Sequence, residues 1–316
     1  MFMNALQLLS NLFLLTCREN GDSISMKIFE TIIDEGQTRL QALFYCGYPE
    51  KMPESSGASE TKFDISGVRS GRVFYAELAQ LFGAGLIFGG ADAKVYETIA
   101  PYQCGAVENE NIPGNIGGLG LDIDNLEKTA ENCQHRLGNP DFNVWQFGPA
   151  PAGGQAAEKF LMFYNYLNQT RWEYDPAAGG YVRYQNDPES PEQFTLSTDR
   201  LTGEAVVRQN IILLEVPHHV LNSSGTIIDF DLTDERGYAW LLRDGAMYEA
   251  CWSAVFSDYP TRSDRYRPFL LYDCATKEPI NFAYGSTWVN VVSPAFWFDT
   301  SGEYLMAKQP FLGYGP

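Results

Sequence analysis

Histidine is scarce in this chain, and its few copies are poorly placed for catalysis. Only His135, His218 and His219 occur among 316 residues, so acyl-transfer triads and histidine metal sites lack components. His218 and His219 are neighbours at the end of an apolar run, where adjacent strand residues point to opposite faces and cannot readily share one metal ion. Neither GxSxG nor HExxH occurs. The sequence therefore predicts no catalytic residue, no metal site and no cofactor.

Positive charge is also scarce, because 22 lysines and arginines face 40 aspartates and glutamates for a formal charge of -18. Such a field repels phosphate backbones and anionic membrane surfaces, which excludes nucleic acid as a natural partner. Hydrophobic residues nevertheless make up 45% of the chain and aromatic residues 14%. This composition is far too apolar for a disordered chain and predicts a packed core.

Long apolar runs are missing, since no segment reaches the 18 or so uninterrupted apolar residues of a membrane span. The opening MFMNALQLLSNLFLLTC resembles a secretory or lipoprotein signal, but its first basic residue is Arg18, and Thr16 precedes Cys17. We therefore predict no signal peptide in this chain and expect the opening to be a buried first element of the fold.

The six cysteines contain no CxxC pair, which removes the usual spacing signal of zinc ribbons and thioredoxin-like sites. Buried thiols and the disulfides of an exported protein both remain open. Cys251 lies on the outgoing arm of a hairpin and Cys274 ends the next apolar run. Neighbouring strands could bring their Cα atoms within the roughly 4.4–6.8 Å that a disulfide needs, and such a bridge would fit an oxidising compartment.

Strand and helix patterns alternate in the first part of the chain. Residues 27–33 and 38–45 predict two strands around a turn at Gly36. Residues 74–82 have helical spacing, and a short strand ending in Gly89-Gly90 leads into a second helix over 91–99.

After about residue 150 the pattern is that of strands alone, including a hairpin turn at Asp244-Gly245. We predict an α+β protein: a mixed α/β N-terminal domain at 1–150, a connecting segment with a hairpin at 151–194, and an antiparallel all-β C-terminal domain at 195–316.

Several motifs, in order along the chain, resemble the YerB-type lipoprotein family of Gram-positive bacteria. They are IFETIIDEGQTRLQALFY, DISGVRSGRVFYAELAQLFGAGLIFGGAD, TRWEYDPAAGGYVRY, NIILLEV, AWLLRDGAMYEACW and GSTWVNVV. The resemblance covers roughly residues 20–293 and implies N- and C-terminal YerB-type domains in an extracytoplasmic protein of the cell envelope. The family has no established biochemical activity, so whether the chain is an enzyme stays open.

The chain departs from the family pattern in three places. Gly67-Val68 lacks an intervening proline, Gly71 replaces the usual alanine, and residues 111–121 lack the expected histidine segment. The family also carries a signal and a lipid anchor ahead of the fold. Here the chain is expected to begin inside the first strand, so any membrane attachment would depend on an anchor that this chain does not contain.

Two arginines and a hydroxyl gather at Arg69-Ser70-Gly71-Arg72, just before the first predicted helix. Guanidinium forks and helix N-terminal amides are suited to a carboxylate or phosphate. Strand alternation could aim Arg39 and Glu30 toward the same edge of the sheet. The alternative is structural: the arginines pair with a carboxylate and tie the loop to the sheet, the candidates being Glu30, Asp34, Glu35 and Glu77.

A glycine turn supplies the rest of the predicted ligand site. Gly89 and Gly90 follow a strand, and Asp92 precedes a helix, so a ligand could approach backbone amides there. The predicted ligand-binding set is thus Arg69, Ser70, Arg72, Arg39, Glu30, Gly89, Gly90 and Asp92. The leading hypothesis is an envelope binding or interaction module whose partner is a small anion or an unknown envelope protein. The alternative is an envelope hydrolase using carboxylates in an interdomain cleft, and Asp229 with Asp231 is one pair that shares a strand face.

Overall fold

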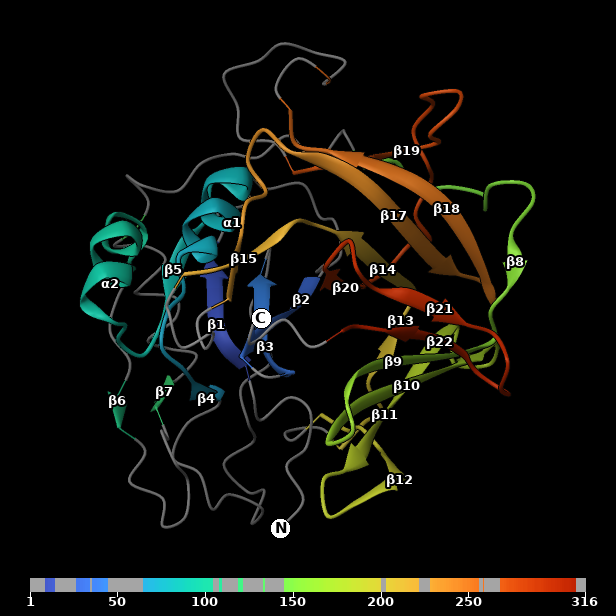
Figure 1. Ribbon diagram of the computed structural model, residues 1–316, viewed down its shortest axis with the longest axis horizontal. Helices are drawn as coiled ribbons and strands as arrows, with labels where there is room; N and C mark the ends of the chain where they lie inside the picture. Colours follow the sequence, from blue (N-terminus) through green and yellow to red (C-terminus); the bar gives the residue numbers. More distant parts are fainter. Residues whose placement is uncertain are drawn as a thin grey trace.

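The computed structural model in Figure 1 shows a sheet-rich fold. It describes residues 9–14, 27–34, 36–44, 65–104, 108–109, 119–121, 133, 145–199, 203–221, 228–255, 258 and 268–310. The predicted loop and helix residues between these ranges, and the cysteines Cys17 and Cys46, lie outside the described residues.

The largest sheet has ten strands. They are β1 (Leu9–Leu14), β2 (Lys27–Asp34), β3 (Gln37–Phe44), β5 (Gly85–Ile87), β8 (Gln155–Ala156), β14 (Asn210–Glu215), β17 (Arg236–Arg243), β18 (Ala246–Ser253), β19 (Leu270–Tyr272) and β20 (Thr287–Val292). Their order is β19-β18-β17-β14-β20-β2-β3-β1-β5, with β8 beside β18. The central β14 reads NIILLE and buries both of its faces, as its continuous apolar run predicts.

A second sheet of seven strands packs against the first. Its strands are β9 (Lys159–Asn165), β10 (Asn168–Asp175), β11 (Gly180–Asp187), β12 (Ser190–Leu196), β13 (Val207–Arg208), β21 (Trp297–Asp299) and β22 (Leu305–Lys308). Two small sheets contain β4 (Ile65–Val68), β6 (Glu108–Asn109) and β7 (Leu119–Leu121), and β15 (His218–Val220) with β16 (Ile228–Phe230).

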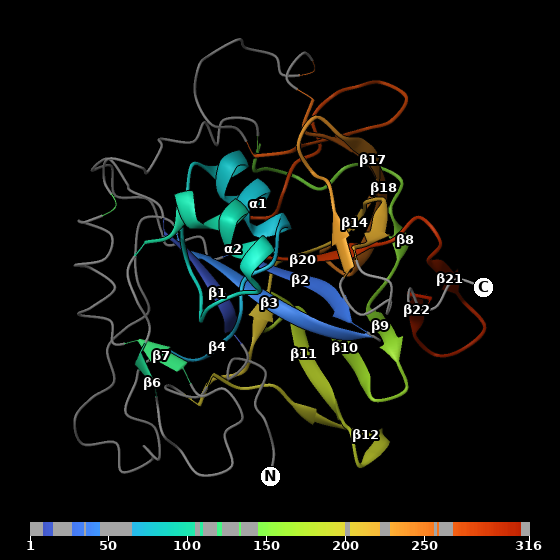
Figure 2. The same ribbon diagram turned by 60° about the vertical axis from the view of Figure 1, so that its left-hand side comes forward.

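The helices lie on the opposite side of the large sheet from the second sheet, as Figure 2 shows. They are α1 (Phe74–Phe82), α2 (Ala93–Ile99) and a 3-10 turn (Ala100–Tyr102). Seven of the nine residues of α1 are buried, and only Glu77 and Gln80 are not. The helix ends at Gly83, whose φ of 60° is a conformation that favours glycine. None of the described helices is long and apolar enough to cross a membrane.

The fold contains two hydrophobic cores, one on each face of the large sheet. The core under α1 includes Phe74 and Phe82 together with Val289. The core between the two sheets includes Trp172 and Trp288. Each core therefore combines residues that lie far apart in the sequence.

The predicted domain division does not match this strand pairing. β20 lies between β2 and β14 and is parallel to both, so the large sheet runs through residues on both sides of the predicted boundary. The described α-helices do lie before residue 103, and the described residues from 145 onward contain none. The change in local pattern along the chain is thus real, but the sheet and both cores cross it.

The two hairpin turns predicted from glycine and aspartate residues are present in the structure. Gly36 has a φ of 80° in the turn between β2 and β3, and Asp244 and Gly245 have φ values of 52° and 76° between β17 and β18. Positive φ at both turn residues is the signature of a two-residue hairpin loop. These hairpins confirm the predicted turns.

Two disulfides are present in the described part of the chain. Cys251 is bonded to Cys274 with a Cα–Cα distance of 5.1 Å, which confirms the predicted pair. Cys104 is bonded to Cys133 with a Cα–Cα distance of 5.7 Å. The second pair joins segments without a local pairing signal, so the sequence did not indicate it.

Candidate functional site

The predicted arginine loop lies between β4 and α1 and is held against the glycine turn. The Gly89 amide donates to the Arg69 carbonyl at 2.9 Å, and the Gly71 amide donates to the Gly90 carbonyl at 2.8 Å. From β3, the Arg39 guanidinium donates to the Ser70 carbonyl. The structure therefore brings the loop, the glycine turn and Arg39 together, as predicted.

Three guanidinium groups converge at this point, and we call Arg39, Arg69 and Arg72 the arginine cluster. Burial, followed by the positive charge of Arg39, lowers the pKa of Arg69. The charges of Arg39 and Arg72 also act on the buried Tyr75 hydroxyl, whose pKa burial nevertheless raises. All three arginines are half-buried. Like charges held this close repel one another, so an anion placed among them would be stabilised.

Glu30 does not join the arginine cluster, because it lies on the other face of the sheet. In the β2–β3 pairing Arg39 is opposite Thr31, whereas Glu30 is opposite Leu40. The buried Glu30 carboxylate accepts hydrogen bonds from the Thr38 hydroxyl at 2.9 Å and from the Trp288 indole at 3.0 Å. The predicted convergence of Glu30 with Arg39 is therefore wrong: successive residues of a strand point to opposite faces.

Glu77 is another proposed partner for the arginines, and its carboxylate is used elsewhere. It accepts hydrogen bonds from the backbone amides of Leu232 and Thr233, the latter at 3.0 Å. Burial raises its pKa. The side chains of Asp34 and Glu35, the remaining candidates, lie outside the described residues.

The glycines of the glycine turn serve packing and turn geometry rather than the predicted binding of a ligand to exposed backbone amides. A Cβ on Gly89 would lie 2.3 Å from Leu119 Cδ1, and Gly90 has a φ of +79°. The exposed Asp92 caps α2, accepting a hydrogen bond from the Lys94 amide at 3.0 Å. These residues support the loop, and Asp92 performs an ordinary helix-capping role.

Gly71 is buried in the arginine loop against α2, and the structure explains why glycine is needed here. A Cβ on Gly71 would lie 2.1 Å from Ile99 Cδ1 of α2. We expect Gly71→Ala to lower the free energy of unfolding by about 1–3 kcal/mol through overpacking. Gly302→Ala is the control, since nothing lies within 4 Å of its Cβ position. Urea titration compares the two; equal effects would contradict the packing argument.

The histidines lie apart from the arginine cluster and do not face one metal. His218 is half-buried, with Nδ1 2.7 Å from the Val216 carbonyl, whereas His219 is exposed at the strand end. His219 Nε2 lies 4.0 Å from a carboxylate oxygen of the buried Asp229. Within the described ranges no group of three or more His, Cys, Asp or Glu side chains is arranged to hold a metal ion.

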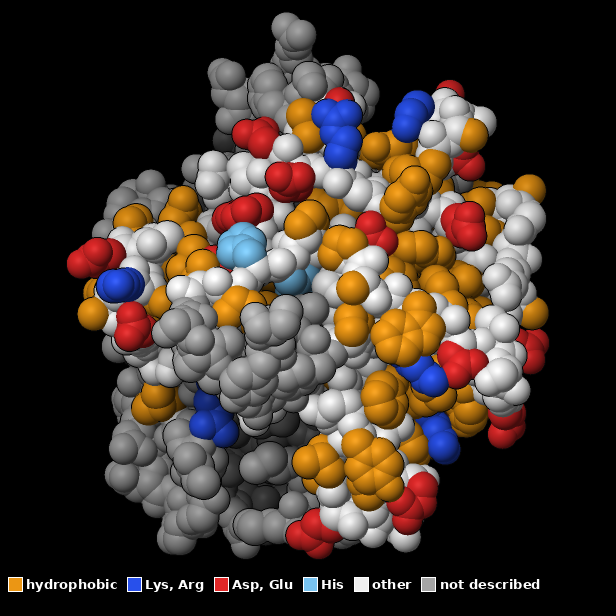
Figure 3. Space-filling view, in the orientation of Figure 1, with side chains coloured by type: hydrophobic (Ala, Val, Ile, Leu, Met, Phe, Trp, Pro, Cys, Tyr) orange, Lys and Arg blue, Asp and Glu red, His pale blue; other side chains and the backbone are white. Residues whose placement is uncertain are grey.

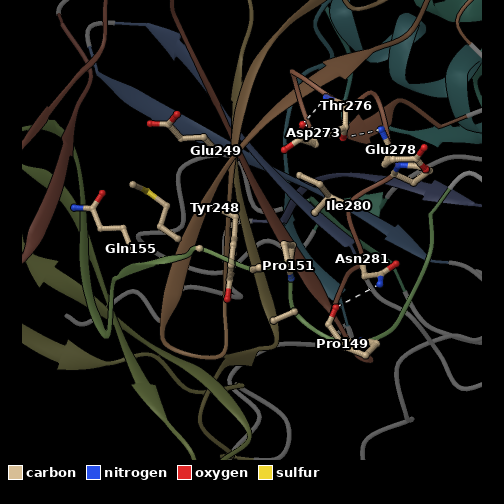
Figure 4. Close-up of a pocket in the computed structure, with 15 residues that line it drawn as sticks. Pro149, Pro151, Gln155, Tyr248, Glu249, Asp273, Thr276, Glu278, Ile280 and Asn281 are labelled. Carbon is tan, nitrogen blue, oxygen red and sulfur yellow. Dashed lines mark hydrogen bonds between the residues drawn. The ribbon is translucent and has the colours of Figure 1, made fainter.

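A pocket of about 620 Å³ opens beside β18, and its residues were not predicted as a site. Figure 4 shows its lining residues, which include Tyr248 and Glu249 of β18 and, on the neighbouring turn, Asp273, Thr276 and Glu278. Residues 149–153, which span the end of the predicted first domain, form another wall. The only feature of the sequence that could have indicated this pocket is the clustering of turn residues in these segments.

Asp273 is locked into its own turn rather than presented to the pocket as an acid. Its Oδ1 accepts hydrogen bonds from the Thr276 amide at 2.7 Å, the Thr276 hydroxyl at 3.0 Å and the Ala275 amide at 3.0 Å. The Thr276 hydrogen bonds lower the pKa of Asp273. A general acid needs the opposite shift, so this carboxylate is suited to accepting hydrogen bonds or binding positive charge.

Comparison with known proteins shows similarity to a protein family, to a bacterial protein and to a solved structure. The C-terminal domain model of a protein family of unknown function, DUF3048, matches residues 161–289. A Bacillus subtilis (strain 168) protein named "Putative lipoprotein YerB" is 29% identical over 293 residues, covering 87% of this chain and 76% of that protein. The crystal structure of the Bacillus subtilis YerB protein has a TM-score of 0.59 at 20% identity, covering 84% of this chain and 82% of that one. These matches confirm the resemblance stated from the motifs.

Proposed function

We propose that this chain, which is a YerB-like protein, is an envelope binding module that holds an anionic group at its arginine cluster. The observation that carries the proposal is the convergence of Arg39, Arg69 and Arg72, with Arg39 fixed on the Ser70 carbonyl. This concentration of positive charge is opposite in sign to the formal charge of the chain, which is -18.

The chemistry of the cluster favours a carboxylate or phosphate as its ligand. Guanidinium groups present planar pairs of donors that match the oxygens of these anions. The Phe74 amide at the start of α1 donates to the buried Asp229 carboxylate. The helix end is thus already occupied, so the arginines rather than the helix amides would hold the anion.

Two observations support an extracytoplasmic location. Disulfides persist in oxidising compartments, and the described chain contains Cys104–Cys133 and Cys251–Cys274. The Bacillus subtilis relative is named a lipoprotein. We infer that the anion is met at the cell envelope, as a small molecule or as an acidic group on an envelope partner.

Substitution of the arginines tests this proposal. With inorganic phosphate and citrate as probes in isothermal titration calorimetry, we expect Arg39→Met and Arg69→Met each to weaken binding about tenfold or more, the worth of one charge-assisted hydrogen bond. The melting temperature should fall by no more than about 2 °C, because each half-buried side chain contributes modestly to stability.

Arg236→Met is the matched control, since the Arg236 side chain is 59% exposed and pairs with Asp258 at 3.6 Å far from the cluster in sequence. It should leave anion binding unchanged. Unchanged anion affinity in the two cluster variants, together with a large loss of thermal stability, would show that these arginines serve the fold and would overturn the proposal.

A further inference from the structure

Aromatic side chains from two sheets form a groove of about 550 Å³ beside the pocket described above. Tyr238 and Trp240 come from β17 of the large sheet, whereas Trp297 and Phe298 come from β21 of the second sheet and Phe296 immediately precedes it. We call this set the aromatic groove. In Figure 3, hydrophobic side chains gather where Figure 1 places β17, β18 and β21.

The rings of the aromatic groove are arranged around Trp240. Its ring centroid lies 4.9 Å from Phe296 and 5.4 Å from Phe298, both nearly edge to face, and 6.5 Å from Tyr238. Packing against these rings fixes the Trp240 indole in place. Tyr238 and Trp297 are 59% and 51% exposed, so the groove offers aromatic surface that the core does not use.

Three carboxylates line the same groove: Glu215, Glu249 and Asp273. Glu249 is directly opposite Trp240 in the β17–β18 pairing, so carboxylate and indole share one face of the sheet. Burial raises the pKa of Glu215, a cost that a bound cation would offset. The residues that line the groove include no lysine, arginine or histidine, although the charge of Lys277, outside the lining, acts on Asp273.

A disulfide holds the acidic edge of the groove in position. Cys251 is opposite Tyr238 in the β17–β18 pairing, and its bond to Cys274 ties the neighbouring Asp273 to β18. Asp273 is in turn fixed by the hydrogen bonds of its own turn. Most of the aromatic wall is therefore carried by strands, and the acidic edge by a turn that the disulfide and its own hydrogen bonds hold in place.

We propose that the aromatic groove binds an organic ammonium group, held over the aromatic faces by cation–π attraction and countered by Glu215, Glu249 and Asp273. The charge of the walls selects a cation, and the exposed rings select one that carries alkyl groups rather than a hydrated metal ion. A lysine-type primary ammonium and a quaternary ammonium headgroup share this chemistry. The proposal is independent of the arginine cluster, which shares no residue with the groove.

NMR titration of the tryptophan indole N–H signals of the intact chain tests this inference. The probes are n-butylammonium, tetramethylammonium and the neutral sugar tri-N-acetylchitotriose. We expect both ammonium ions to shift indole signals saturably and the sugar to leave them unchanged. Tighter binding of n-butylammonium identifies a lysine-type ligand, whereas tighter binding of tetramethylammonium identifies a quaternary headgroup.

Variants locate the binding site. Tyr238→Ser and Glu249→Gln should each weaken ammonium binding about threefold, the scale of a partly exposed cation–π or charge contact. Tyr166→Ser and Glu192→Gln are the matched controls, because both side chains are exposed and lie outside the groove. They should leave the affinity unchanged.

Three results would overturn the inference. These are the absence of any saturable shift with either ammonium ion, saturable binding of the sugar alone, and equal weakening by the groove variants and their controls. Arg39→Met should not change ammonium binding, so failure of the anion proposal is distinguishable from failure of this one.

Discussion

Arg183→Met is expected to lower the free energy of unfolding by about 3–5 kcal/mol, the usual cost of leaving a buried charge without the opposite charge that compensates it. Arg183 and Glu30 are 2% and 1% exposed, and the charge of Glu30 acts on the Arg183 guanidinium between the two sheets. Without Arg183, the Glu30 carboxylate would remain in the core with only neutral donors, those of Thr38 and Trp288.

The position of Arg183 explains the size of this effect. Its guanidinium lies 4.9 Å from the centre of the Trp288 ring and donates to Ser197 Oγ at 2.9 Å and Gln185 Oε1 at 2.7 Å. Arg183 belongs to β11 of the second sheet, whereas Glu30 and Trp288 belong to the large sheet. Arg183, Glu30 and Trp288 therefore connect the two sheets through their shared core.

Urea unfolding measures the loss, with the exposed Arg236→Met as the control that should change stability by less than about 1 kcal/mol. A double-mutant cycle with Glu30→Gln tests the electrostatic coupling between Arg183 and Glu30. If the charges are coupled, Arg183→Met should cost much less in the Glu30→Gln background. Additive losses in the cycle would contradict a direct role of Glu30.

Local features of this fold could be predicted from the sequence because they depend on neighbouring residues. The helix at Phe74–Phe82 follows from apolar spacing, and the Asp244-Gly245 hairpin from residues that tolerate positive φ. The Cys251–Cys274 pair joins segments only 23 residues apart. Each of these signals is contained within a few dozen residues.

The sheet crossing the predicted domain boundary has no such local signal. The hydrogen bond from Trp288 to Glu30 joins residues 258 positions apart. A parallel pair such as β2–β20 requires only that both strands be apolar and buried, and many strands of this chain meet that condition. The change from a mixed to a strand-only pattern was therefore interpreted as a domain boundary, although the chain returns to complete the first sheet.

The candidate site was partly predictable for the same reason. The contacts of Arg39 with the loop at Ser70 follow from a strand edge next to a loop. Glu30 was predicted on the wrong face of the sheet. Successive strand residues point to opposite faces, and Thr31 rather than Glu30 shares the face of Arg39. The aromatic groove combines strands far apart in sequence, and alternate aromatic residues in strands are more often core, as Trp172 and Trp288 are here.

His218 is expected to make the protein less stable by about 3 kcal/mol as the pH falls from 6.5 to 4. Burial lowers its pKa from 6.5 to about 4, so below pH 6.5 the unfolded chain binds a proton that the folded chain does not. The contribution of His218 is therefore fully retained above pH 6.5 and is lost progressively as the pH falls toward 4. The nearby carboxyls of the half-buried Glu77 and the buried Asp229 act in the opposite sense, because burial raises their pKa and the folded state takes up their protons first.

Urea unfolding at a series of pH values separates these contributions. His218→Gln can keep a hydrogen bond to the Val216 carbonyl but cannot titrate, so its stability should depend less on pH between 6.5 and 4 than that of the unsubstituted chain. His219→Gln is the control: His219 is exposed, and its replacement should preserve the slope. A slope unchanged by His218→Gln but removed by His219→Gln would assign the acid sensitivity to the exposed histidine beside Asp229 and contradict the burial argument.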